Sequence, residues 1–478
     1  MQSSPLTLNQ QHAENRTRMD LMQSEAMIQA RSYRSSRFIT ILAFLSGMGL
    51  MIHVRLGVRL SLTELFAPFL FVAMSAGLRE LLANRVIRNL IFFIGLNLVG
   101  IVVSDLLGDV PFMDTMKGVA KPVFILLLAI NFGLLFVHGV RFLIPIYFGF
   151  FVGSVLHLFF NTGDDLYDFS LSSMDYAFFV FRVSTAVNLS AGIAGFYLLK
   201  VNRFLGLVPM VVAMVISVVF SSRSAMVVWF AATCALIYAT RWTAINWVSV
   251  YSPKRVIWAF FSGSFVLGMI SYLIHIEVSK LDLLSQTSKQ KANIEQLDNS
   301  IGYGPIGLLM AGRAEVVGSI LMIADSPIIG HGTSSLCGDY FVRAFHLANQ
   351  RRTADSAQLD AEMRHEKIMT GHSIMFHSWA SHGILALPLW LFILSSLFRS
   401  LTVLLLVKSP YTPFLVLQVI SLFWDIFFSP LAVQTRAWIP LSLAFFAFYI
   451  PQVQHEAAFH LMQWNRSSRS PIGKPAVA

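Results

Sequence analysis

The sequence has little charge and almost no cysteine. Only 13% of its 478 residues are Asp, Glu, Lys or Arg, about half the share found in soluble domains, whereas 56% are hydrophobic. So few charges cannot cover the surface of a soluble protein of this size, which excludes that class. The two cysteines, Cys234 and Cys337, lie in an apolar run and in a polar loop, and we expect no disulfide between them.

Several familiar patterns are also missing. No signal-peptide cleavage pattern precedes the first apolar run, which begins near Phe38, so we expect that run to remain as a membrane anchor. The strict alternation of a membrane β-barrel strand is missing. There is no internal repeat, which argues against a transporter built from two similar halves. There is no obvious pair of spaced carboxylates, which a hydrolytic glycosidase would need.

What the sequence does contain is a series of apolar runs of about 17 to 22 residues, each long enough to cross a bilayer. Helices satisfy every backbone polar group within one segment, so the runs predict membrane-spanning helices. The expected fold is all-α, a polytopic bundle of about 12 transmembrane helices. Their predicted centres are Leu45, Phe69, Leu96, Ile130, Phe151, Ser190, Val212, Phe230, Val266, Pro388, Leu417 and Ala444.

Positive charge predicts the orientation, because Lys and Arg gather in cytoplasmic loops. That rule places both termini in the cytoplasm and accounts for the net charge of +10, so we expect no nucleic-acid partner. One long polar segment follows the ninth span and therefore lies outside the cytoplasm. The predicted organisation is a tail over 1–37, spans 1–9 over 38–275, a large helical periplasmic loop over 276–371, spans 10–12 over 372–452 and a second tail over 453–478.

Three histidines mark the start of the tenth span. His372, His377 and His382 are five residues apart, and each step turns a helix by about 140°, so they do not share one face. We therefore expect no metal triad. His372 lies in a polar turn that water and substrate can reach. His377 and His382 are expected to be structural residues with satisfied hydrogen bonds.

Other ionisable residues lie at or within the spans. Arg223 is placed at the outer mouth of the seventh and eighth spans, and Arg313 lies on an apolar helix candidate. Charges inside a membrane must face the bundle interior, a cavity or a partner. For three further ionisable residues, the sequence does not predict which of these environments they occupy; they are Arg182, Asp425 and Arg436.

Three segments, taken in order, resemble motifs of the O-antigen ligase and Wzy-type polysaccharide polymerase superfamily. They are "SSRSAMVVWF", "GRAEVVGSILMIADSPIIGHGTSSL" and "GHSIMFHSWASHGIL". The last resembles a signature of the form His-Asn-x-x-Leu followed by Glu-x-Gly-x-x-Gly. His372 matches its histidine, and Gly383 matches its first glycine. Ser373, Phe376, Ser381 and Ala386 stand where Asn, Leu, Glu and Gly are common. The resemblance covers mainly residues 205–400.

The resemblance implies a metal-independent glycosyltransferase at the outer face of a bacterial inner membrane. The donor would be a glycan on undecaprenyl pyrophosphate. The acceptor would be another lipid-linked unit in a polymerase, which we favour, or the lipid A core in a ligase. No cofactor and no nucleotide sugar is implied. A chain-length regulator and a flippase of the same pathway are further candidate partners.

The resemblance also implies the catalytic residues. Arg223 and Arg313 would bind the pyrophosphate, because guanidinium groups bond phosphate oxygens bidentately. His372 would act as the base for the attacking hydroxyl. The candidate substrate-binding residues are Ser222, Ser224, Gly330, Gly332, Ser373 and Arg436.

A different class stays open: a polytopic transporter or flippase with Arg182 and Asp425 as charges along its pathway. The sugar, the linkage, the acceptor and the oligomeric state do not follow from the sequence.

Overall fold

The computed structural model describes residues 37–56, 58–160, 184–202, 204–219, 228–236, 314–333, 340, 373–406, 411–429, 431 and 433–469. Of these, 88% lie in helices, so the predicted helical class is confirmed. Four segments are long and apolar enough to cross a membrane, which agrees with a membrane protein; they are Leu62–Ala83, Arg85–Leu107, Phe112–Val137 and Ile384–Leu404. The count of about twelve spans stays a prediction.

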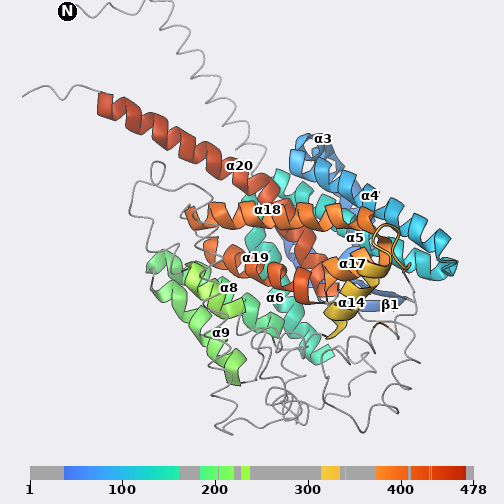
Figure 1. The fold of residues 1–478 in the computed structure, drawn as a ribbon. Helices are drawn as coiled ribbons and strands as arrows, with labels where there is room; N and C mark the ends of the chain where they lie inside the picture. Colours follow the sequence, from blue (N-terminus) through green and yellow to red (C-terminus); the bar gives the residue numbers. More distant parts are fainter. Residues whose placement is uncertain are drawn as a thin grey trace, which may run out of the picture.

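The first third of the chain is a row of helices with one small hairpin (Figure 1). A helix over Arg37–Gly49 comes first. The hairpin pairs Arg55 with Arg59 across antiparallel strands, where the sequence suggested only a loop. The elements are β1 His53–Leu56, β2 Val58–Ser61, α2 Leu62–Met74, η1 Ser75–Gly77, α3 Leu78–Ala83, α4 Arg85–Leu107, α5 Phe112–Val137, η2 Val140–Phe142 and α6 Leu143–Phe160.

The rest of the chain adds helices before and after residues 237–313, which lie outside the described residues. They are α8 Ser184–Val201, η4 Leu205–Leu207, α9 Val208–Val219, α14 Ala314–Asp325, α17 Ile374–His382, η6 Ile384–Ala386, α18 Leu387–Leu406, α19 Thr412–Phe428 and α20 Val433–Arg469. Helix α20 continues past residue 453, the predicted start of the C-terminal tail, and extends away from the bundle (Figure 1).

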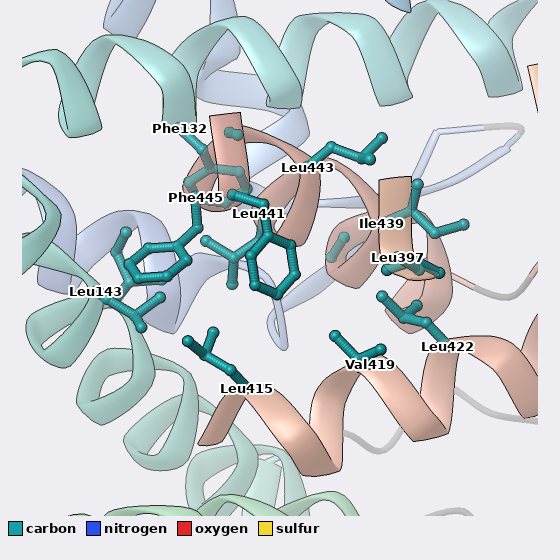
Figure 2. Close-up of a cluster of buried hydrophobic side chains, with 14 of the residues drawn as sticks. Phe132, Leu143, Leu397, Leu415, Val419, Leu422, Ile439, Leu441, Leu443 and Phe445 are labelled. Carbon is teal, nitrogen blue, oxygen red and sulfur yellow. The ribbon is translucent and has the colours of Figure 1, made fainter. Parts of the chain in front are cut away.

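The hydrophobic core lies where α5, α6, α18, α19 and α20 meet. Figure 2 shows side chains from these five helices converging on one volume. Phe445 of α20 meets Phe136 of α5 edge to face, with ring centroids 5.3 Å apart. Lipid tails are as apolar as leucine, so close packing, more than expulsion of water, holds such a core together. The labelled members are Phe132, Leu143, Leu397, Leu415, Val419, Leu422, Ile439, Leu441, Leu443 and Phe445.

The first helix packs against α6 through glycines. Gly149 and Gly153 form a G-x-x-x-G pair on α6, and Gly47 lies on the partner helix. A Cβ at any of the three would overlap backbone of the other helix, at Phe44, Met48 or Ile146. This is the small-residue contact by which membrane helices bring their backbones together.

Candidate functional site

The site is built around α17, a short helix at the end of the bundle where α4 ends and α5 begins. Ser373 is its N-cap: the Ser373 hydroxyl accepts a hydrogen bond from Phe376 N (3.2 Å) and donates one to the Ile426 carbonyl of α19 (3.2 Å). With nine residues, α17 is too short to cross a bilayer. Gly383 ends it with φ 69°, and the spanning segment that contains α18 follows.

The loop that follows α14 docks on the C-terminal end of α17. The Trp379 indole donates to the Pro327 carbonyl (2.9 Å). Three backbone hydrogen bonds join the two segments: His331 N to Ala380 O (2.9 Å), Gly332 N to Ser381 O (2.8 Å) and Ile384 N to Ile328 O (3.1 Å). The loop thereby pairs the last carbonyls of α17, which no residue of that helix can satisfy.

Two of the predicted substrate-binding residues, Gly330 and Gly332, lie in this docked loop. Their φ angles are 80° and 84°, in the left-handed region that favours glycine. A Cβ on Gly330 would lie 2.5 Å from both Gly383 N and Ser381 O. Both glycines therefore allow the loop to approach the helix end. A role in substrate binding stays a prediction.

A hydrogen-bonded chain runs from α4 through the loop to α17. The buried Asp105 carboxylate accepts from Thr333 N (2.6 Å) and from the Thr333 hydroxyl (2.8 Å). Thr333 Oγ1 also lies 3.4 Å from His382 Nε2. Since the single hydroxyl hydrogen is given to Asp105, His382 must donate from Nε2, which leaves Nδ1 as the unprotonated nitrogen of the ring.

A pocket of about 50 Å³ opens beside this chain. Four side-chain atoms on its lining residues are buried without a hydrogen-bond partner: His377 Nδ1, His382 Nδ1, Asn97 Oδ1 and Trp390 Nε1. Lys121 of α5 faces the pocket, and its side chain is exposed. The lining residues are Asn97, Ile101, Gly118, Lys121, Pro122, Ile125, Thr333, Ile374, His377, Ser378, Ser381, His382, Leu389, Trp390 and Leu431.

The surroundings keep both histidines of α17 neutral. Burial lowers the pKa of His377 to about 4, and the charge of Lys121 acts in the same direction. Burial likewise lowers the pKa of His382 to about 3, with smaller contributions from His377 and Lys121. A neutral imidazole offers one donor and one acceptor. Because Nε2 of His382 donates to Thr333, its Nδ1 can only accept, whereas His377 Nδ1 can accept a hydrogen bond or, as the other tautomer, donate one into the pocket.

Arg436, another predicted substrate-binding residue, is buried at the start of α20 beside Glu64 of α2. The guanidinium lies 3.5 Å from Glu64 Oε1, while Glu64 Oε2 accepts from Ser61 N (2.7 Å) in a capping box. This ion pair satisfies the requirement that a charge inside a membrane has a partner. Substrate binding by Arg436 stays a prediction.

The remaining predicted site residues lie outside the described residues. They are Arg223, Arg313, His372, Ser222 and Ser224, and Arg182 of the transporter hypothesis also lies there. The chain places two of them directly beside described elements, because α14 begins one residue after Arg313 and α17 is capped one residue after His372.

One expectation is corrected here: the hydrogen bonds of His377 and His382 are not all satisfied, since both Nδ1 atoms are buried without a partner. The sequence reasoning also missed Lys121, Asn97, Asp105 and Thr333. A signal for Lys121 was present, because a lysine inside an apolar run is expected to face a cavity or a partner. Within the described part of the chain, no group of three metal-ligating side chains occurs.

Comparison with known proteins leaves the family open. No protein-family model matches the chain, and no curated protein sequence is significantly similar to it. Membership of the O-antigen ligase and polymerase superfamily therefore depends on the motif resemblance alone.

Proposed function

We propose that this protein is a glycosyltransferase of the bacterial inner membrane that joins undecaprenyl-pyrophosphate-linked oligosaccharides at the periplasmic face, as a polymerase of exopolysaccharide or O-antigen. One observation supports this most. The loop Pro327–Thr333 and the helix that follows His372 belong to two separate motifs of the resemblance; they dock on each other, and Thr333 and that helix line the same pocket. Motifs that meet at a pocket are typical of an active site.

The residues of the proposed site suit the reaction. The acceptor hydroxyl oxygen attacks the anomeric carbon of the donor sugar, and the bond from that carbon to the pyrophosphate oxygen breaks. His372 takes the hydroxyl proton, and lipid pyrophosphate leaves with the bonding electron pair. Arg223 and Arg313 offset the charge that develops on the leaving oxygen. Ser373 positions the start of α17 immediately after the base, because its hydroxyl bonds to α19.

The test uses a host that lacks its own polymerase and accumulates the matching lipid-linked units. Wild-type protein and the variants Arg223→Ala, Arg313→Ala and His372→Ala are expressed to equal membrane levels, and extracted glycans are separated on a gel. His138→Ala is the control, since His138 caps the opposite end of α5. We expect a ladder with wild type and with the control, and none with the three variants.

Other outcomes of this assay contradict the proposal in identifiable ways. A single-step shift of glycan onto a second lipid would identify a ligase. A normal ladder from all three variants would remove the assigned roles. Single units that stay unchanged with wild type, in a host of confirmed substrate match, would favour the transporter with Arg182 and Asp425.

A further inference from the structure

Lys121 is a lysine that has no counter-charge among the described residues, in a helix long and apolar enough to cross a membrane. It lies in the third turn of α5, within the segment Phe112–Val137. No described residue accepts a hydrogen bond from its ammonium group or forms an ion pair with it. Lys117, one turn earlier on the same helix, is by contrast paired with Asp114 at 2.8 Å. Ionisable side chains inside membranes are costly, so one that lacks a protein partner and faces a pocket points to a ligand.

The acidic groups around the pocket are already engaged. Glu64 divides its two oxygens between Arg436 and the backbone of Ser61. Both carboxylate oxygens of Asp105 accept hydrogen bonds from Thr333. Arg436 is close enough to repel Lys121 electrostatically. Among the described residues the charge of Lys121 is therefore uncompensated, and an anion entering the pocket beside it would offset that charge.

The pocket also holds unused hydrogen-bonding capacity. Asn97 is 4% exposed, lines the pocket, and its Oδ1 has no partner. A flip of this amide would present its NH₂ group instead. His377 Nδ1 is likewise unpartnered and becomes a donor in the other neutral tautomer. Lys121 thus has two polar neighbours, on α4 and α17, that can donate to the same ligand.

We infer that this pocket binds a phosphate group, with Lys121 as its counter-charge and with Asn97 and His377 as hydrogen-bond donors. A phosphate oxygen accepts strong bonds from a cation and from neutral donors together. The inference deepens the proposed function and depends on it for one point, the identity of the ligand as the lipid pyrophosphate. Inorganic phosphate is the other source of the same chemistry. Lys121 also lies outside the stretch 205–400 that carries the motif resemblance.

The test measures binding of inorganic pyrophosphate to the purified full-length protein in detergent, by calorimetry at fixed ionic strength. Lys121→Met removes the charge at similar length, Lys121→Arg keeps it, and Lys117→Met is the matched control one turn away. Loss of a charged hydrogen bond weakens binding by about 10- to 100-fold. We expect that loss in Lys121→Met, a Kd within about 3-fold of wild type in Lys121→Arg, and no change in Lys117→Met.

Three results would overturn the inference: no saturable binding by wild type, equal binding by Lys121→Met, or equally effective displacement by a neutral methyl glucoside. Thermal unfolding shows whether Lys121→Met is folded. If it is not folded, Asn97→Leu provides the second variant. We expect it to bind pyrophosphate more weakly than wild type, and an unchanged Kd would overturn the inference.

Undecaprenyl phosphate in nanodiscs then identifies the source of the phosphate. Displacement of inorganic pyrophosphate by this lipid supports a lipid-linked ligand. Its failure to displace assigns the pocket to a free phosphate and overturns the lipid identification alone. Because binding is measured without glycan transfer, a protein that binds pyrophosphate but makes no polymer would refute the proposed function and leave the phosphate site standing.

Discussion

Gly383→Ala should undock the loop that brings Thr333 to the pocket. Gly383 has φ 69° and ψ −167°, a region that is essentially restricted to glycine and costs other residues about 1–3 kcal/mol. The added Cβ would overlap the Ile328 carbonyl oxygen and lie 2.6 Å from the Ile329 carbonyl carbon. Because these are backbone atoms, the loop itself must move, and overpacking of this kind costs about 1–3 kcal/mol more.

The two contributions together predict a destabilisation of about 2–6 kcal/mol, with loss of the hydrogen bond from Ile384 N to Ile328 O. The assay is the thermal midpoint in detergent, followed by tryptophan fluorescence, together with limited proteolysis. The control is Gly95→Ala on α4, where a Cβ meets nothing within 4 Å. Alanine favours a helix over glycine by about 1 kcal/mol, so this control should equal or exceed wild type.

A Gly383→Ala protein with the midpoint and protease resistance of Gly95→Ala would refute this reasoning. It would mean that the loop tolerates a side chain at its closest approach to the helix end. The docking of the two motif segments would then no longer support the proposed function.

Two further predictions concern buried charge. His377 has a pKa of about 4 in the folded protein and about 6.5 when unfolded, so it contributes stability above pH 6.5 that is lost as pH falls toward 4, by about 3 kcal/mol. The thermal midpoint of wild type should fall over that range more steeply than that of His377→Gln, and parallel curves would contradict the assignment. Glu64→Gln leaves the Arg436 guanidinium without its carboxylate and should cost about 3–5 kcal/mol. Asp114→Asn removes the partner of the more exposed Lys117 and should cost less than about 1 kcal/mol; equal losses in both would contradict the argument from burial.

Much of the architecture could be predicted from the sequence. The long apolar runs correctly predicted helices α4 and α6, which are centred close to the predicted residues Leu96 and Phe151. This is possible because a membrane-spanning helix is recognised by length and hydropathy alone. The hairpin at β1 and β2 was missed, since strands of four residues carry too few side chains to show alternation. The length of α20 was missed as well, because hydropathy marks where a span leaves the membrane and not where its helix ends.

The pocket depended on tertiary structure. A five-residue spacing places His377 and His382 on different faces of a helix, which is correct for α17 itself. Both nevertheless line one pocket, because α17 stops at Gly383 and the pocket closes around its end, where the docked loop brings in Thr333. Asn97 and Lys121 come from two other helices. The sequence by itself determined which segments are helical and apolar, since these are local properties of the chain. Only the packing of four separate segments decided which polar atoms were left facing one another without partners.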